Sequence, residues 1–353
     1  MKLHKLEAVR GLASIYVILH HLILNKAFMY HKLRVFGVGL TSIFGFGQEA
    51  VIVFFILSGF VIKYSHDNTK DKSFKSYFLK RFTRIYIPLI FAFIFSYIVA
   101  SLSIHGFAKI DFKNLLGNLL MLQDLPESKP NVICSPFLNN DPLWSLSYEW
   151  WFYMIYFVLD KYVPVIYQNK FVIILTTLAA VSYCIYPCFP NRIFLYFSIW
   201  WAGACLVKFY LSKDYRTVIY PFLLLIANTI IMKFNMIYVQ DYKHIPISSG
   251  KHPELEFRHF ISSVFISGGS VIWRKLKWVF FNIIIKPFQI FAPISYFMYI
   301  SHNYIVVDPI YLNFITNGIV KMITSFAILF ILSYLVELII YPKIKNWVFY
   351  IFK

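Results

Sequence analysis

Apolar stretches of helix-spanning length recur along the chain and alternate with short polar segments. About 20 residues of α-helix cross the hydrocarbon core of a bilayer, where a helix satisfies its own backbone hydrogen bonds. No alternating pattern of the kind found in membrane β-barrels is present. The sequence therefore predicts an all-α, polytopic transmembrane bundle of about ten spanning helices. The ten stretches lie near residues 6–25, 44–62, 85–104, 143–159, 171–187, 193–210, 217–232, 259–273, 294–313 and 319–341.

Basic residues between these stretches predict the orientation of the bundle. Residues 63–84 contain seven Lys and Arg residues against two Asp residues, which is typical of a cytoplasmic segment. An even number of spans then places both termini in the cytoplasm and residues 105–142 outside. Because no repeat or linker interrupts the pattern, we expect a single membrane domain over residues 1–353, in the inner (cytoplasmic) membrane.

Composition supports the membrane assignment. Hydrophobic residues make up 59% of the 353 residues and charged residues only 14%, whereas soluble domains carry about 25% charged residues. The net charge of +18 would suggest nucleic acid in a soluble protein, but here the basic residues gather between apolar stretches. We therefore expect contact with the lipid bilayer and an anionic cofactor, and no binding of nucleic acid.

The cysteines and the first residues exclude two other features. The chain has four cysteines: Cys134, Cys184, Cys188 and Cys205. They form no CxxC pair and no matched histidine set accompanies them, so no metal site is expected. A disulfide from Cys134 to Cys184 or Cys188 is left open. The first apolar stretch follows Glu7 and Arg10 without a small-residue cleavage site, so no cleavable signal peptide is expected.

The first stretch, LEAVRGLASIYVILHHLIL, contains an arginine and two histidines at membrane depth. Such groups are costly there and are usually paired or functional. Arg10 and His21 are eleven residues apart, roughly three helical turns plus 20°, so they share a face about 16 Å apart along the axis. His20 points about 100° away. We interpret Arg10 and His21 as facing a shared cavity; the alternative is a histidine hydrogen-bonded within the bundle.

Two further segments have polar residues at helical spacing. In VFFILSGFVI, the pair Ser58-Gly59 favours close helix packing over substrate contact. Glu49, at the start of the same stretch, needs a partner that the sequence does not name. In FLKRFTRIYIP, Arg81 and Arg84 share a helical face, where an arginine pair binds phosphate or anchors the cytoplasmic side.

The fourth and ninth stretches contain the remaining candidates. In DPLWSLSYEWWFYMIY, Ser145 and Glu149 share a face at i and i+4, and an intramembrane glutamate is a functional candidate. In PISYFMYISHNYIV, Ser295, Tyr299 and His302 form a polar stripe on an apolar helix. The stripe suits a polar seam within the bundle and the wall of a substrate cavity equally well.

Together and in this order, these segments resemble the acyltransferase type 3 family of membrane acyltransferases. The motifs are RGLASIYVILHH, FFILSGF, RFTRIY, LWSLSYEWWFY and SYFMYISHNY, spanning residues 6 to about 304. The resemblance implies a ten-helix protein that moves an acyl group, commonly acetyl, from coenzyme A to a hydroxyl on a surface glycan or related acceptor. It also implies that Arg10 and His21 form the family's arginine–histidine pair, that Arg81 and Arg84 lie near the acyl donor, and that Glu149 is the family's glutamate.

Acyl transfer from a thioester needs a base, donors for the oxyanion and a grip on the anionic donor. We expect His21 to be the base and Glu149 to orient it. Arg81 and Arg84 would hold the coenzyme A phosphates, and Arg10 would bind nearby. A covalent acyl-histidine is the alternative route. The other residues expected to line the substrate cavity are Ser58, Ser145, Ser295, Tyr299 and His302.

The expected partners are acyl-CoA, most simply acetyl-CoA, and a glycan or glycolipid acceptor, with no metal; the oligomeric state stays open. Two other classes of function suit the same pattern. A transporter or flippase of lipid-linked sugars also needs polar residues inside its helices. An inactive scaffold with this fold would keep the bundle without the chemistry. Consumption of the acyl donor separates the enzyme from both.

Overall fold

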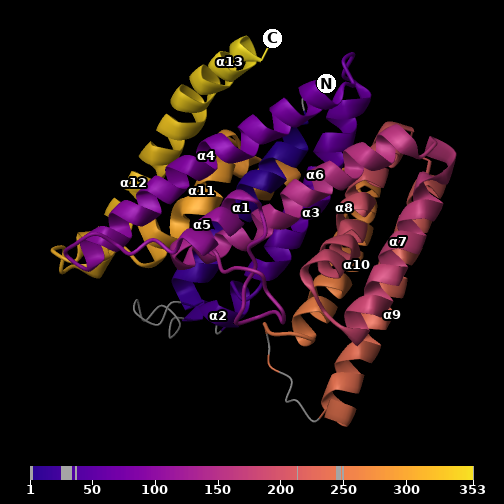
Figure 1. The fold of residues 1–353 in the computed structure, drawn as a ribbon, viewed down its shortest axis with the longest axis horizontal. Coiled ribbons are helices and arrows are strands. Elements are labelled where there is room, and N and C mark those ends of the chain that lie inside the picture. Colours follow the sequence, from indigo (N-terminus) through magenta and orange to yellow (C-terminus); the bar gives the residue numbers. More distant parts are fainter. Residues whose placement is uncertain are drawn as a thin grey trace.

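A computed structural model of the chain describes residues 3–24, 34–35, 38–212, 214–243, 248 and 250–352. Most of them are helical, which confirms the predicted all-α fold (Figure 1). The only strands in these ranges are the two-residue antiparallel pair β1 (Arg34–Val35) and β2 (Val38–Gly39). The α-helices are α1 (His4–Leu24), α2 (Leu40–Ile43), α3 (Gly47–Asp67), α4 (Phe74–Ser103), α5 (Phe112–Leu119), α6 (Trp144–Tyr162), α7 (Val165–Ile185), α8 (Phe189–Ser212), α9 (Arg216–Lys243), α10 (Glu254–Lys275), α11 (Ser295–His302), α12 (Gly318–Tyr334) and α13 (Tyr341–Ile351).

Eight helical segments in the described residues are long and apolar enough to cross a membrane. Short π and 3-10 turns extend two of them, so that the last two predicted spans become Phe281–Val307 and Gly318–Ile351. The predicted spans at 143–159 and 259–273 are also helical, as α6 and α10, but they are not among these eight. The count of ten spans therefore stays a prediction.

The arginine pair lies inside a long helix. α4 begins at Phe74 and runs for 30 residues through Pro88, so Arg81 and Arg84 belong to the same helix as the span that was predicted to start near residue 85. Pro is tolerated inside transmembrane helices because neighbouring groups satisfy the freed carbonyl. Both arginines thus project from a rigid element, on one face and one turn apart.

The start of α1 and the end of α13 lie at the same end of the bundle (Figure 1). Basic residues gather there: the Lys5 ammonium lies 4.6 Å from the centre of the Trp278 ring, and the guanidinium of Arg274 donates to the last carbonyls of α8. We call it the basic end of the bundle. Its position on the cytoplasmic side stays a prediction from the distribution of Lys and Arg.

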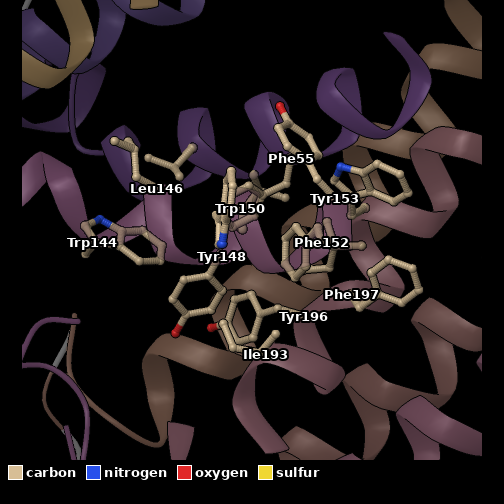
Figure 2. Close-up of a cluster of buried hydrophobic side chains, with 14 of the residues drawn as sticks. Phe55, Trp144, Leu146, Tyr148, Trp150, Phe152, Tyr153, Ile193, Tyr196 and Phe197 are labelled. Atoms are coloured by element: carbon tan, nitrogen blue, oxygen red, sulfur yellow. The ribbon is translucent and has the colours of Figure 1, made fainter. Parts of the chain in front are cut away.

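Helix α8 is the centre of the bundle. In its most apolar stretch of 18 residues, 78% of the residues are buried, whereas the same share is 28% for α7 at the periphery. Aromatic side chains of α3, α6 and α8 fill the space between these helices, as Figure 2 shows for Phe55, Phe152 and Phe197. α3 and α8 can approach closely because Gly59 has no side chain: a Cβ there would lie 2.0 Å from the Trp200 carbonyl oxygen. The predicted packing role is therefore confirmed at Gly59.

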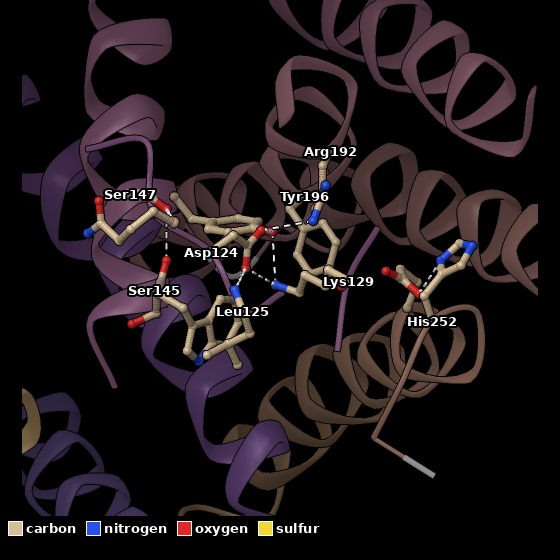
Figure 3. A network of polar contacts seen from close by, with 12 residues as sticks. Asp124, Leu125, Lys129, Ser145, Ser147, Arg192, Tyr196 and His252 are labelled. Atoms are coloured by element: carbon tan, nitrogen blue, oxygen red, sulfur yellow. Dashed lines mark hydrogen bonds and ion pairs between the residues drawn. The ribbon is translucent and has the colours of Figure 1, made fainter. Parts of the chain in front are cut away.

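A buried ionic network fastens the segment before α6 to α8 (Figure 3). The Asp124 carboxylate accepts hydrogen bonds from Lys129 and from Arg192, both at 3.0 Å, and from the Tyr148 hydroxyl at 2.7 Å. The side chains of Asp124, Lys129 and Arg192 are fully buried. Burial lowers the pKa of Lys129 to about 8, although the carboxylate opposes this shift. The network fixes the start of α6, the helix of Ser145 and Glu149.

All four cysteines lie within the described residues and are free thiols. No disulfide therefore joins Cys134 to Cys184 or Cys188. Cys134 instead packs against α5, since a Cβ on Gly117 would lie 2.4 Å from its Sγ. This close contact explains a small residue at position 117.

Candidate active site

A cavity of ≈ 330 Å³ opens between α1, α3, α4, α6 and α11, near the basic end. Eight of the ten residues singled out from the sequence line it. These are Arg10, Ser58, Arg81, Arg84, Ser145, Glu149, Ser295 and Tyr299. The other two, His21 and His302, are not among its described lining residues. Five helices that are far apart in sequence thus bring most of the predicted site together.

The two arginines of α4 have different surroundings. Arg84 is ion-paired with Glu337, and its guanidinium lies 4.9 Å from the centre of the Tyr296 ring. Arg81 makes no ion pair within the described part of the chain, and its Nε is buried without a hydrogen-bond partner. The Arg81 guanidinium instead lies 5.1 Å from the centre of the Tyr77 ring. Arg81 is therefore the cation of this pair that is available to an anionic ligand.

Glu337 was not singled out from the sequence. Its Oε2 pairs with Arg84, and its Oε1 accepts the backbone N–H of Phe297 at 3.0 Å. Both interactions use a side chain that is almost fully buried. The sequence signal was a lone acid in the last apolar stretch, where an ionised group needs a partner.

Arg10 faces the same cavity from α1. Its Nη2 donates to the carbonyl of Ala292 at 2.9 Å, and its Nε is buried without a partner in the described residues. α1 can lie close to this segment because Gly11 has no side chain: a Cβ there would lie 2.0 Å from the Phe288 carbonyl oxygen. Arg10 therefore keeps part of its donor capacity for a ligand.

Glu149 belongs to a cluster of hydroxyl groups at the middle of the cavity. The Tyr153 hydroxyl donates to its carboxylate, and the Ser58 hydroxyl lies 3.2 Å from the same oxygen. Trp200 of α8 donates its indole N–H to Ser58 at 3.2 Å. None of the described contacts of Glu149 is with His21. The expectation that Glu149 orients His21 is therefore not supported by a contact.

A second pair of hydroxyls lies on the cavity wall between α6 and α11. The Ser145 Oγ and the Tyr299 hydroxyl are 2.9 Å apart and hydrogen-bonded. Ser295 lies one turn earlier on α11 and donates to the Ala292 carbonyl at 2.8 Å. Both serines and Tyr299 line the cavity, which agrees with the cavity-lining interpretation of the α11 stripe.

The three histidines near α1 divide into two environments. The His302 ring contacts the His21 ring in a tilted arrangement, with centroids 5.2 Å apart, and its centroid is 6.1 Å from that of Tyr299. The Nδ1 of His302 lies 2.7 Å from the Tyr299 carbonyl, and its Nε2 is buried without a partner in the described residues. His21 therefore connects to the cavity through His302.

His20 precedes His21 on α1, and the two rings meet edge-on with their centroids 5.1 Å apart. Its Nδ1 is 2.5 Å from the Phe44 carbonyl oxygen, just before α3 begins. A Cβ on Gly47 would lie 2.2 Å from the imidazole ring. His20 thus has a packing role at the start of α3, although its ring also contacts that of His21.

The partner that the sequence did not name for Glu49 is Arg258. The Nη2 of Arg258, on α10, lies 2.7 Å from a Glu49 carboxylate oxygen at the start of α3. This ion pair ties α3 to α10 and does not belong to the cavity.

A transmembrane helical bundle with this cavity defines an integral membrane protein with a polar, arginine-lined site. Comparison with known proteins supplies the class: a family model described as an acyltransferase domain matches residues 3–342, and the chain therefore belongs to that family. The resemblance to the acyltransferase type 3 family is thus confirmed.

One curated relative carries the same description. The chain is 31% identical over 174 residues to acyltransferase MdmB of Streptomyces mycarofaciens, a match that covers 47% of this chain and 42% of that protein. The chain thus matches less than half of its relative's length. No solved structure matches the chain.

Proposed function

We propose that this membrane acyltransferase moves an acyl group, in the first place acetyl, from acyl-coenzyme A to a hydroxyl of a cell-surface glycan or glycolipid precursor. The observation that carries the proposal is the cavity itself. It combines the unpaired Arg81 with Arg10 at the basic end and serine and tyrosine hydroxyls further in. Cations suit the phosphates of the donor, and hydroxyls suit a thioester and a sugar.

The donor enters from the basic end in this proposal. A cavity of ≈ 330 Å³ is at the small end of the range of ligand sites, so it takes the pantetheine arm while the nucleotide stays at the mouth. The excess of basic residues at this end supports a cytoplasmic position for it, where acyl-CoA is available, and a location of the protein in the inner membrane. Arg81 would then hold a phosphate, with Arg10 close to the pantetheine.

The chemistry follows from the groups further in. The oxygen of the acceptor hydroxyl attacks the thioester carbonyl, a C–O bond forms and the C–S bond breaks. His21 takes the proton of the hydroxyl, and that proton then goes to the sulfur, so that an ester and free coenzyme A thiol are produced. The hydrogen-bonded hydroxyls of Ser145 and Tyr299 on the cavity wall would donate to the oxyanion.

His302 takes the orienting role in this scheme. It is one helical turn beyond Tyr299, and its ring contacts both His21 and the cavity-lining Tyr299. Glu149 instead holds the Ser58 and Tyr153 hydroxyls at the middle of the cavity. The base and the glutamate therefore act at different depths of the bundle.

Purified protein in lipid nanodiscs, incubated with acetyl-CoA, tests the proposal. We expect release of coenzyme A thiol that depends on addition of a glycan acceptor, and an acetyl ester on the recovered glycan. A flippase or an inactive scaffold leaves the donor intact. Mass analysis of surface glycans from cells with and without the gene identifies the acceptor by the loss of one acyl mass.

The two arginines of α4 should respond differently to substitution. Arg81→Ala is expected to raise the KM for acetyl-CoA roughly tenfold to a hundredfold, since a hydrogen bond to a charged group contributes about 1.5–3 kcal/mol. The KM for the acceptor should not change. Arg84→Ala should mainly lower thermal stability, because it leaves Glu337 buried without its cation. If wild type and Arg81→Ala have the same KM for acetyl-CoA, Arg81 does not bind the donor.

A further inference from the structure

A second polar cavity, of ≈ 250 Å³, lies between α3, α7, α8 and α9. It shares no described lining residue with the candidate active site. Three of its lining residues are cations, Lys63, Lys208 and Arg216, and none of the described lining residues is acidic. Because Lys63 follows Ser58 and Ile62 on α3, this basic cavity lies at the basic end, on the other side of that helix.

Two of the three cations that line this cavity make no ion pair within the described residues. Lys63 pairs with Asp67 at 2.6 Å, but Lys208 and Arg216 make no ion pair within the described residues. Two other cations of this end are engaged by aromatic rings: the ammonium groups of Lys5 and Lys275 lie 4.6 Å from the centres of the Trp278 and Tyr215 rings. Lys208 and Arg216 are exposed cations that both line this one cavity, which favours an anion bound between them.

Amide groups complete the wall of the basic cavity. The Asn169 side-chain oxygen accepts the indole N–H of Trp201 at 2.9 Å and faces the thiol of Cys205 at 3.6 Å. Its NH₂ group is thus the part left to donate into the cavity. An NH₂ donor beside Lys208 and Arg216 matches the acceptor oxygens of a phosphate.

The surroundings identify the kind of phosphate. α7 and α9 are peripheral helices whose outward side chains are apolar and exposed, among them Ile166 (77%) and Leu223 (55%). In a bilayer these faces contact acyl chains. A phosphate in the basic cavity would therefore continue into lipid tails along α7 and α9, as in basic pockets between transmembrane helices that hold anionic headgroups.

We propose that this cavity binds the headgroup of an anionic phospholipid, with Lys208 and Arg216 as its main ligands. The proposal does not depend on acyl transfer, so its test uses lipid binding alone. Full-length protein is purified in detergent and titrated with phosphatidylglycerol or phosphatidylcholine, and bound lipid is counted by native mass spectrometry. We expect wild type to retain phosphatidylglycerol preferentially.

The variant Lys208→Gln with Arg216→Gln should weaken phosphatidylglycerol binding at least about tenfold, the loss expected for charged hydrogen bonds to phosphate. The matched control is Lys161→Gln with Lys343→Gln, which removes two exposed charges outside both cavities. Its binding should stay within about twofold of wild type, because neither lysine lines the basic cavity. The charge-preserving variant Lys208→Arg should bind like wild type, which separates binding from misfolding.

Three outcomes would overturn the proposal. Equal loss in the two double variants would show that the basic end attracts lipid only by its overall charge. Equal retention of phosphatidylcholine would show that the phosphate charge is not recognised. Displacement of the lipid by inorganic phosphate or by coenzyme A at low concentration would assign the cavity to a soluble phosphate instead.

Discussion

Replacing His21 by alanine is expected to lower the rate of acyl transfer about 10²- to 10⁴-fold, the usual contribution of a general base. The acceptor hydroxyl then has no group to take its proton, while the donor site around Arg81 is unchanged. The effect should therefore appear in kcat rather than in the KM for acetyl-CoA. Thiol release from acetyl-CoA measures the rate, and the midpoint of thermal unfolding shows that the variant is folded.

His20→Ala is the matched control, because it removes the neighbouring imidazole of the same helix. The His20 ring is hydrogen-bonded to the Phe44 carbonyl and packs against Gly47, so the variant should lose thermal stability. Its transfer rate per folded molecule should stay near wild type. A folded His21→Ala protein that acetylates at the wild-type rate would exclude His21 as the base.

Hydropathy was sufficient to predict the fold because lipid leaves few alternatives. A backbone in hydrocarbon must be helical, so each of the ten apolar stretches became helix, including α6 and α10 with their charged residues. The predicted helix ends were less accurate. α4 starts at Phe74, eleven residues before the predicted span at residue 85, because the amphipathic turn with Lys80 and Arg81 continues the helix. Polar residues at a helix end do not stop it when no breaker is present.

Helical spacing predicted which face a residue occupies, but not what it faces. Arg10 and His21 were placed on one face of α1, yet about 16 Å of helix separates them, so they lie at different depths. Arg10 lines the cavity, whereas His21 meets His302 beyond it. The partner is set by the packing of α1 against α11, which a single sequence does not encode locally.

The same reason explains the ionic partners that were missed. Arg84 and Glu337 are 253 residues apart, and no local pattern links them. Asp124 and Arg192 are 68 residues apart, and Asp124 lies in residues 105–142, which were predicted to be outside the membrane. An acid at an apolar position signals that a partner exists, as it did for Glu49, but only the tertiary structure names it.

Asp124→Asn should produce the largest loss of stability. It leaves Lys129 and Arg192 side by side, fully buried and without their counter-charge. Breaking a buried pair in this way costs about 3–5 kcal/mol, because the remaining charges stay desolvated. The Lys129 ammonium would keep only the Tyr148 hydroxyl, at 2.9 Å, and the faces of nearby rings. Thermal unfolding of the purified protein, followed by intrinsic fluorescence, measures the loss.

Asp67→Asn provides the matched control, since it also removes an aspartate that pairs with a lysine. The Asp67 side chain is 41% exposed, and water replaces its contact with Lys63, so the expected cost is about 0–1 kcal/mol. Adding Lys129→Met to Asp124→Asn should recover part of the loss, because one of the two unpaired charges is then gone. If Asp124→Asn unfolds at the same temperature as Asp67→Asn, the buried network does not hold the start of α6 in place.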